Sequence, residues 1–268
     1  MMADHSHLLA ELSEGIKTLT TSDRWANYLK VQSAFHNYSS QNTMLILVQN
    51  PYATRVAGYN KWKSLGRQVR KGEKGIFILA PLVFKTEKDN GEVEKGIKGF
   101  RYVSVFDISQ TDGEDLPEVA TRLVGEDPTG TFMNLKQVAS GLGFSVIDHE
   151  FEGETNGDCN HASKTIRVHS KNEPAQRVKT LAHEIAHAIL HDPDEIDYRT
   201  NRGLCELEAE STAFVVCRTL GIESDDYSFG YVAGWAGGGD EAVAAIGKSQ
   251  ARIQKAANAM LKPLNTNE

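Results

Sequence analysis

The first half of the chain distributes its apolar residues with two different periods. Apolar side chains recur with helical spacing in three segments, and Ser22 and Ser40 stand where helices would begin. The predicted helices cover residues 7–19, 22–35 and 40–48. Residues 76–84 and 100–108 are instead rich in β-branched and aromatic side chains, and they flank an Asn90-Gly91 turn signal. The pattern predicts a β-hairpin with a charged tip.

The second half returns to the helical period, interrupted by two short β-rich segments. The predicted helices cover residues 134–142, 174–191, 204–220, 227–235 and 240–261, and the predicted strands cover 145–148 and 165–169. Pro174 suits a first helical turn, and Gly221 stands at a stop position. The order of elements predicts an α+β fold in both halves.

Residues 108–130 separate the two halves. This segment is acidic, contains two prolines and three glycines, and shows no sustained periodicity. It therefore reads as a linker or a surface connection. We expect two domains, with N-terminal helices plus a β-hairpin in residues 1–128 and a second domain in residues 129–268.

Composition narrows the class of protein. Hydrophobic residues make up 40% of the 268 residues and charged residues 24%, which excludes wholesale disorder. No apolar run approaches the ~20 residues of a membrane span, and the N-terminus lacks the features of a signal peptide. The three scattered cysteines form no CxxC pair and fit a reducing compartment. We expect a cytoplasmic protein with no membrane partner.

The charge is unevenly distributed. The net charge is −7, yet residues 1–80 alone carry 10 Lys+Arg against 5 Asp+Glu. Most of the cations lie in a basic aromatic segment, residues 51–75, interleaved with tyrosine and tryptophan. Cations that follow a phosphate backbone and aromatic faces that stack on bases are typical of single-stranded nucleic-acid binding. The candidate DNA contacts are Arg55, Tyr59, Lys61, Trp62, Lys63, Arg67, Arg70, Lys71 and Lys74. The alternative is that Tyr59 and Trp62 pack a small core.

The sharpest motif is HExxH, formed by His183, Glu184 and His187. On an α-helix, residues four apart lie one turn apart and about 40° around the axis, so both imidazoles can reach one ion. Glu184 beside them can take the proton of a metal-activated water. The apolar residues around the motif would bury one side of the helix and hold the ligands still. The sequence therefore predicts one zinc ion per chain.

A third ligand is needed, and the next helix offers it. Glu206 and Glu210 share a face there, and we expect Glu206 to ligate while Glu210 orients a ligating histidine. The alternative is a solvated acidic helix face. His191 is a weaker candidate, because it lies about 80° around the helix from His183 and no glycine turn precedes it. Cys159 and His161 are a further weak candidate pair for a second site.

Several blocks, in this order, resemble the ArdC-like antirestriction proteins across nearly the whole chain. They are NYSSQNTMLILVQNP, AGYNKWKSLGRQVRKGEKGIFILAP, HEIAHAILH, ELEAESTAFVVCRTLGI, YVAGW and DEAVAAIGKSQARIQKAANAML. The resemblance implies a single-stranded-DNA-binding domain in residues 1–128. It implies a zincin-like metallopeptidase domain, related to the ImmA/IrrE group, in residues 129–268. It also places Glu206 where the third acidic ligand is expected.

Three functions follow as alternatives. The first is a single-stranded-DNA-binding protein whose zinc peptidase domain cleaves an unknown protein substrate, with Glu184 as the base and Tyr231 or His169 as an oxyanion donor. The second is a non-catalytic shield of single-stranded DNA with a structural metal. The third is a regulatory metalloprotease that cleaves a repressor.

Overall fold

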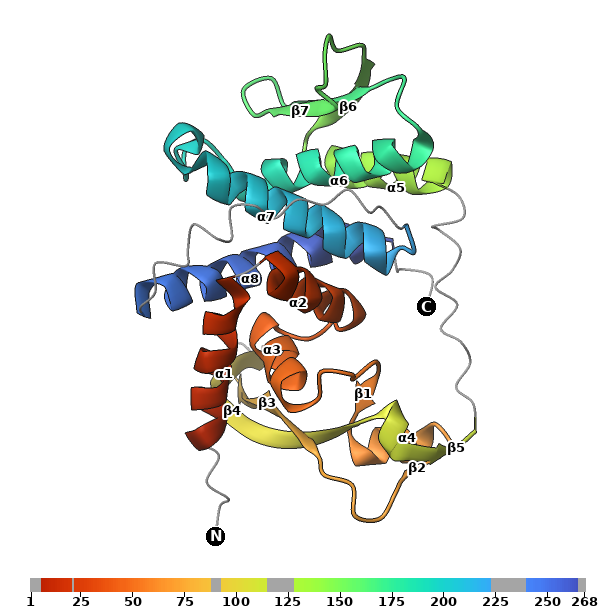
Figure 1. Cartoon of the computed structure of the whole chain (residues 1–268), viewed down its shortest axis with the longest axis vertical. Helices are drawn as coiled ribbons and strands as arrows, with labels where there is room; N and C mark the ends of the chain where they lie inside the picture. The colour runs from red at the N-terminus through yellow and green to blue at the C-terminus, as the bar shows by residue number, and fades with distance from the viewer. Residues whose placement is uncertain (1–5, 21, 88–92, 115–127, 223–239, 265–268) are drawn as a thin grey trace. The chain divides into compact units, whose positions relative to one another are not determined.

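The computed structural model describes residues 6–20, 22–87, 93–114, 128–222 and 240–264. The chain forms two compact units. The first unit comprises Met1–Gly15 and Gln41–Leu116, and the second comprises Ile16–Ser40 and Pro117–Glu268. Both combine helices with sheets (Figure 1), so the predicted α+β class is confirmed.

The first unit is built on a long β-hairpin. Its strands are β1 (Val56–Ala57), β2 (Arg67–Val69), β3 (Ile76–Glu87), β4 (Val93–Asp107) and β5 (Thr111–Gly113). Its helices are α1 (Ser6–Lys17), α3 (Ser40–Gln49), α4 (Tyr59–Ser64) and the 3₁₀ turn η2 (Ile108–Gln110). The antiparallel sheet has the order β1-β4-β3, and β2 pairs with β5 in a second, two-stranded sheet.

Helix α3 covers the outer edge of β3 with two amide side chains. The amide of Asn42 donates to the Leu79 carbonyl at 2.9 Å and accepts from the Leu79 amide at 2.8 Å. Gln49 makes the same pair of bonds with Phe77, both at 2.9 Å. These amides, seven residues apart on α3, satisfy backbone groups that an edge strand would otherwise leave unpaired.

The second unit is a stack of helices below a small sheet. Its helices are α2 (Ser22–Ala34), α5 (Pro128–Gly141), α6 (Pro174–Leu190), α7 (Tyr198–Thr219) and α8 (Asp240–Leu261), with the 3₁₀ turn η1 (Thr18–Thr20) before α2. Its strands are β6 (Ser145–His149), β7 (Gly157–Asn160) and β8 (Thr165–His169), in the order β6-β8-β7. Helix α6 lies between this sheet and α7 (Figure 1). Its buried residues Leu181, Ala182, Ile185 and Ala186 form much of the core.

Helix α2 belongs to this second unit, although it lies early in the sequence. Trp25, Tyr28 and Leu29 are completely buried, and the Trp25 indole donates to the Ser211 hydroxyl of α7 at 2.9 Å. The division at residue 128 stays a prediction. A division of the chain at that residue would assign α2 to the first domain, although α2 packs on α7 of the second unit.

Two sequence expectations need correction. The pattern predicts no strand over residues 157–160, but they form the edge strand β7, antiparallel to β8. The start of the expected linker is also ordered, because β5 pairs with β2 from Arg67 to Val69. The predicted helix over 227–235 and the Asn90-Gly91 turn lie outside the described residues.

Candidate functional site

Helix α6 places the HExxH residues on the inner side of the second unit. The helix starts with Pro174 in its first turn, where a missing amide proton costs nothing. It buries Leu181, Ile185 and Ala186 on one side. The helix is thereby fixed against its neighbours, and His183 and His187 are held one turn apart on the same side.

His183, His187 and Glu206, here called the metal triad, converge on one point. The two histidine Nε2 atoms are 3.0 Å apart. The Glu206 Oε2 atom lies 3.3 Å from His183 Nε2 and 3.8 Å from His187 Nε2. Ligands about 2.0–2.1 Å from a tetrahedral zinc ion would be about 3.3 Å apart, so the donor atoms fit such an ion. Among the described residues, the triad is the one group of this kind that could hold a metal.

Glu210 fixes the orientation of His183. Its Oε2 atom lies 3.0 Å from His183 Nδ1, and its Oε1 atom lies 3.2 Å from the Lys179 ammonium. Burial raises the pKa of Glu210, but the hydrogen bond with His183 and the charge of Lys179 outweigh burial and lower it. A carboxylate at this position accepts the Nδ1 proton, which leaves the Nε2 lone pair of His183 for a metal.

A second chain of contacts orients His187, and the sequence did not reveal it. His187 Nδ1 lies 2.9 Å from His191 Nδ1, and His191 Nε2 lies 3.1 Å from Glu208 Oε2. Glu208 also accepts from Ser249 at 2.7 Å and from Arg252 at 3.0 Å. If His191 donates to Glu208, its Nδ1 accepts the proton of His187 Nδ1, and His187 Nε2 keeps its lone pair. His191 thus lies beside the triad as an orienting group.

Tyr198 holds Glu206, the third residue of the triad, in place. Its hydroxyl donates to Glu206 Oε1, so that Oε2 faces the histidines. Asn201 has non-helical backbone angles, which separates the first turn of α7 from the rest of the helix. Burial raises the pKa of Glu206, but hydrogen bonds from His183, His187 and Tyr198 hold it far below its usual range. Glu206 is therefore an anion in the folded chain.

The pKa values of His183 and His187 are shifted in opposite directions. Burial lowers the pKa of His183, but its bonds with Glu206 and Glu210 outweigh burial and raise it to about 10. Burial lowers the pKa of His187 to about 4, so this imidazole is neutral.

Glu184 is buried beside the triad, against strand β7. Burial raises its pKa to about 7, so it can exchange a proton near neutral pH. A Cβ at Gly157 would lie 3.2 Å from Glu184 Cγ and 2.6 Å from Thr180 Cγ2. The strand approaches α6 this closely because residue 157 is glycine.

Among the described residues, the weaker candidates are not part of the group of donor atoms that converges at the triad. His161 Nε2 lies 3.2 Å from the His187 carbonyl, and burial raises the pKa of Cys159 to about 12, which keeps the thiol protonated. His169 contacts the Lys171 amide through Nδ1. Tyr231 lies outside the described residues.

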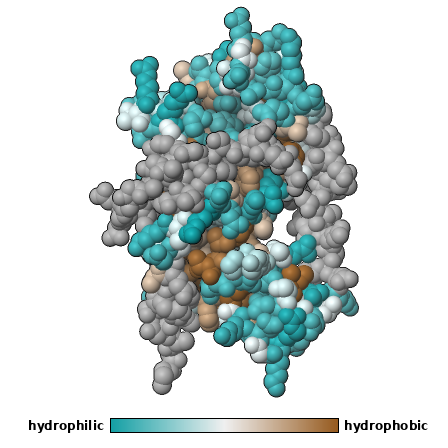
Figure 2. Space-filling model, in the orientation of Figure 1, coloured by the Kyte–Doolittle hydropathy of each residue, from teal (hydrophilic) through white to brown (hydrophobic). Residues whose placement is uncertain are grey.

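In the first unit, part of the basic aromatic segment lines an open groove of about 910 Å³. The groove is lined by Tyr59, Gln68, Val69, Arg70, Lys71, Glu73, Phe106 and Asp112. Lys61, Lys63, Lys71 and Lys74 are exposed, and Arg55 is half-buried. Outside the parts drawn in grey, the face shown in Figure 2 is mostly hydrophilic.

Trp62 does not contribute a stacking face, and that prediction is wrong. Its side chain is only 2% exposed, and its indole donates to the Phe106 carbonyl at 2.8 Å. Arg67 donates to Thr111 at 2.8 Å, and Arg70 pairs with Glu73 at 2.7 Å. Both arginines support the fold of the groove. Their contacts with DNA stay predictions.

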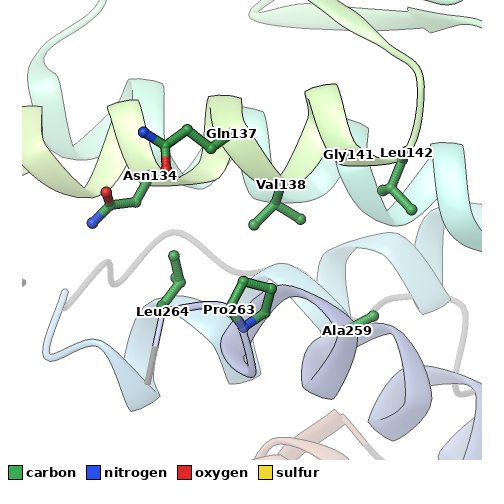
Figure 3. Close-up of a pocket in the computed structure, with 8 residues that line it drawn as sticks. All are labelled: Asn134, Gln137, Val138, Gly141, Leu142, Ala259, Pro263 and Leu264. Carbon is green, nitrogen blue, oxygen red and sulfur yellow. The ribbon is translucent and has the colours of Figure 1, made fainter. Parts of the chain in front are cut away.

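A separate cavity of about 550 Å³ lies between α5 and the end of α8 in the second unit. Figure 3 shows Asn134, Gln137 and Val138 facing Ala259, Pro263 and Leu264 across it. None of its lining residues is ionisable. The cavity therefore offers no group for acid–base chemistry. No described helix is long and apolar enough to cross a membrane.

Known proteins resemble both units. Residues 5–123 match the N-terminal domain of anti-restriction factor ArdC, and residues 139–217 match the IrrE N-terminal-like domain of the M78 peptidases. A Bacillus anthracis protein, pXO2-81, is 25% identical over 281 residues, which cover 90% of this chain. The match covers 47% of that relative, so this chain spans about half its length.

Solved structures show the same fold. The metal-free crystal structure of the antirestriction protein ArdC from the R388 plasmid has a TM-score of 0.55 and 24% identity, covering 84% of this chain and 85% of that one. Its Mn(II)-bound structure has a TM-score of 0.53 and 23% identity, covering 86% of each chain. The two domain matches in sequence and the similarity in fold to R388 ArdC point to the same family. The chain is an ArdC-like protein, in which an ArdC N-terminal domain precedes an IrrE-like domain.

Proposed function

We propose that the chain is a zinc-dependent peptidase that also holds single-stranded DNA. The convergence of three donor atoms of the metal triad, within 4.8 Å of one another, carries the first part of the proposal. Two neutral imidazole nitrogens and one carboxylate are a donor set that zinc takes in catalytic sites, with a fourth position left for water or substrate. The Mn(II)-bound structure of R388 ArdC supports a divalent metal at this fold.

Each residue around the triad has a separate role in the proposed reaction. When bound, zinc would acidify a water molecule and polarise a substrate carbonyl. Glu184, which is buried beside the triad, accepts the proton of the attacking water and returns it to the leaving amine. Glu210 and His191 keep the two imidazoles turned toward the metal. Tyr198 holds Glu206 and lies against His187, with ring centroids 5.8 Å apart.

The groove of the first unit supports the DNA-binding part. It combines the Tyr59 ring with the cations of Arg70 and Lys71. Exposed lysines nearby supply further positive charge for a phosphate backbone. The ArdC N-terminal match covers all of these residues.

The decisive experiment measures zinc content, peptide cleavage and DNA affinity on the same preparations of the full chain. We expect His183→Ala to lose zinc, while Glu184→Gln keeps zinc and loses cleavage about 10²–10⁴-fold. Both variants should bind single-stranded DNA like the wild type. A parallel series with Mn(II) tests which metal supports cleavage.

The alternatives make different predictions. If Glu184→Gln keeps full protection of DNA from restriction in cells, the chain acts as a shield and cleavage serves another task. If the wild type cleaves a protein but does not bind DNA, the third alternative, a regulatory metalloprotease, is correct. If purified wild type binds no divalent metal, the proposal of a metal centre is wrong.

A further inference from the structure

The β-hairpin of the first unit buries one of its faces near β1, and its other face, here called the open face, is half-buried to exposed. Alternate residues of a strand point to the same side, so the register of β3 and β4 assigns each side chain to a face. Ile76, Ile78 and Val105 are buried on the packed face. Phe100 and Tyr102 of β4 belong to the other face, opposite Pro81 and Leu79 of β3.

The open face carries a row of aromatic residues along β4. Phe100, Tyr102 and Phe106 alternate with residues of the packed face, and the exposed Ser104 lies between them. Residues two apart along a strand are separated by about 6.6–6.8 Å. Phe106 is also part of the lining of the groove that contains Tyr59, so the row leads from the groove toward the outer hairpin.

The outer end of this row is exposed. The Phe100 side chain is 61% exposed, and Val83 and Ile97, which pair across the hairpin beyond it, are more than half exposed. Tyr102 and Phe106 are half-buried, so the exposed apolar surface is at the outer end of the row. Single exposed apolar residues are ordinary, but several on one face mark a recognition surface.

The charges near the row favour an occupant that carries phosphates. Lys98, two residues before Phe100, is exposed. Residues 41–84, which form most of the remaining unit, contain seven Lys and Arg and a single acidic residue, Glu73. Aromatic side chains on an open sheet face stack on unpaired bases, and neighbouring cations bind the phosphates. A duplex keeps its base faces covered and cannot use the row in this way.

We propose that the open face of β4 is a single-stranded-DNA site, in which bases stack on Phe100 and Tyr102 and the strand continues into the groove at Tyr59 and Lys71. This inference rests on the proposed DNA-binding function and goes beyond it. It moves the stacking contacts from the buried Trp62 to the hairpin, which the basic aromatic segment does not include.

The test is a titration of the full-length chain with a fluorescein-labelled oligothymidylate and with a duplex of the same length. We expect Phe100→Ala and Tyr102→Ala each to weaken single-strand binding about 5- to 100-fold, with an unchanged salt slope. Lys71→Ala should instead reduce the slope of log K against log salt by about 0.7. Phe100→Trp, which retains an aromatic face, should restore binding.

Phe84→Ala is the matched control. Phe84 lies on the same hairpin and is 44% exposed, but it belongs to the opposite face and covers Gly96. Its replacement should leave DNA affinity unchanged. Equal losses in Phe84→Ala and Phe100→Ala would mean that the hairpin fold matters and stacking on this face does not, which overturns the inference.

The remaining outcomes separate the inference from the function on which it rests. If the wild type binds the oligothymidylate and Phe100→Ala binds it equally well, the site on β4 is wrong and DNA binding stands. If the wild type binds neither probe, the proposed DNA function fails and the site fails with it.

Discussion

Replacing Glu208 by Gln tests the contacts that orient His187. The Glu208 side chain is 1% exposed and faces His191, Ser249 and Arg252 at 3.1, 2.7 and 3.0 Å. Removing one partner of a fully buried ion pair costs about 3–5 kcal/mol. The Arg252 side chain is 29% exposed and can be partly hydrated, so we expect a loss of about 2–3 kcal/mol in the free energy of unfolding.

The same change should weaken zinc binding. An amide at position 208 no longer imposes the proton arrangement that leaves the His187 Nε2 lone pair free. Loss of such an outer hydrogen-bonding partner lowers metal affinity about 10–100-fold. Urea unfolding of the metal-free chain measures the stability loss, and competition with a chelator measures the zinc affinity.

The exposed Glu154 provides the control, because Glu154→Gln removes the same charge without a buried partner. It should change neither quantity. If Glu208→Gln lowered stability but bound zinc like the wild type, Glu208 would support only the packing of α8, and the orientation of His187 through His191 would be refuted.

Three further changes test other parts of the structure. Gly157→Ala places a Cβ 2.6 Å from Thr180 Cγ2 and 2.9 Å from the Arg167 carbonyl. Thermal unfolding should therefore show that this variant loses about 1–3 kcal/mol in the free energy of unfolding. Gly141→Ala is the control, because a Cβ there meets no atom within 4 Å and should leave the stability unchanged. Burial raises the pKa of Asp107, but amide hydrogen bonds from Ser109, Thr54 and Arg55 outweigh burial and lower it. A lowered folded pKa contributes stability that is present above the ordinary carboxyl pKa of about 4 and is lost as the pH falls through the folded value. Urea unfolding as a function of pH should therefore show a steeper acid loss in the wild type than in Asp107→Asn. Trp62→Phe removes the bond to the Phe106 carbonyl and should cost about 1–2 kcal/mol in urea unfolding, while DNA affinity stays unchanged if the indole is only structural.

Local spacing made part of the candidate site predictable. His183 and His187 are four residues apart on a strongly apolar helix, so their common side follows from helix geometry alone. The hairpin of β3 and β4 follows in the same way from two β-rich segments around a turn signal. In both cases the interacting residues lie in one element or in two consecutive elements of the chain. The local sequence pattern is therefore enough to predict that they meet.

Other contacts depend on residues far apart in sequence. The polar segment GDCN has no strand-like alternation, and it forms β7 because β8 supplies a backbone to pair with. Trp62 looked like a stacking face because its neighbours are cations, yet the carbonyl that binds its indole lies on β4. Glu208 gave no signal either, since its partners Ser249 and Arg252 lie on α8.

The spacing of three glutamates on α7 explains how one helix serves two histidines of α6 and one beyond its end. Glu206 and Glu210, four residues apart, share the side that faces α6, where they reach the triad and His183 Nδ1. Glu208 points to another side, where Ser249 and Arg252 of α8 donate to it. His191 follows the last helical residue, Leu190, and its ring lies between His187 and Glu208. The end of α6 is therefore part of the site, because His191 there connects His187 to a carboxylate of α7 that Ser249 and Arg252 hold in place.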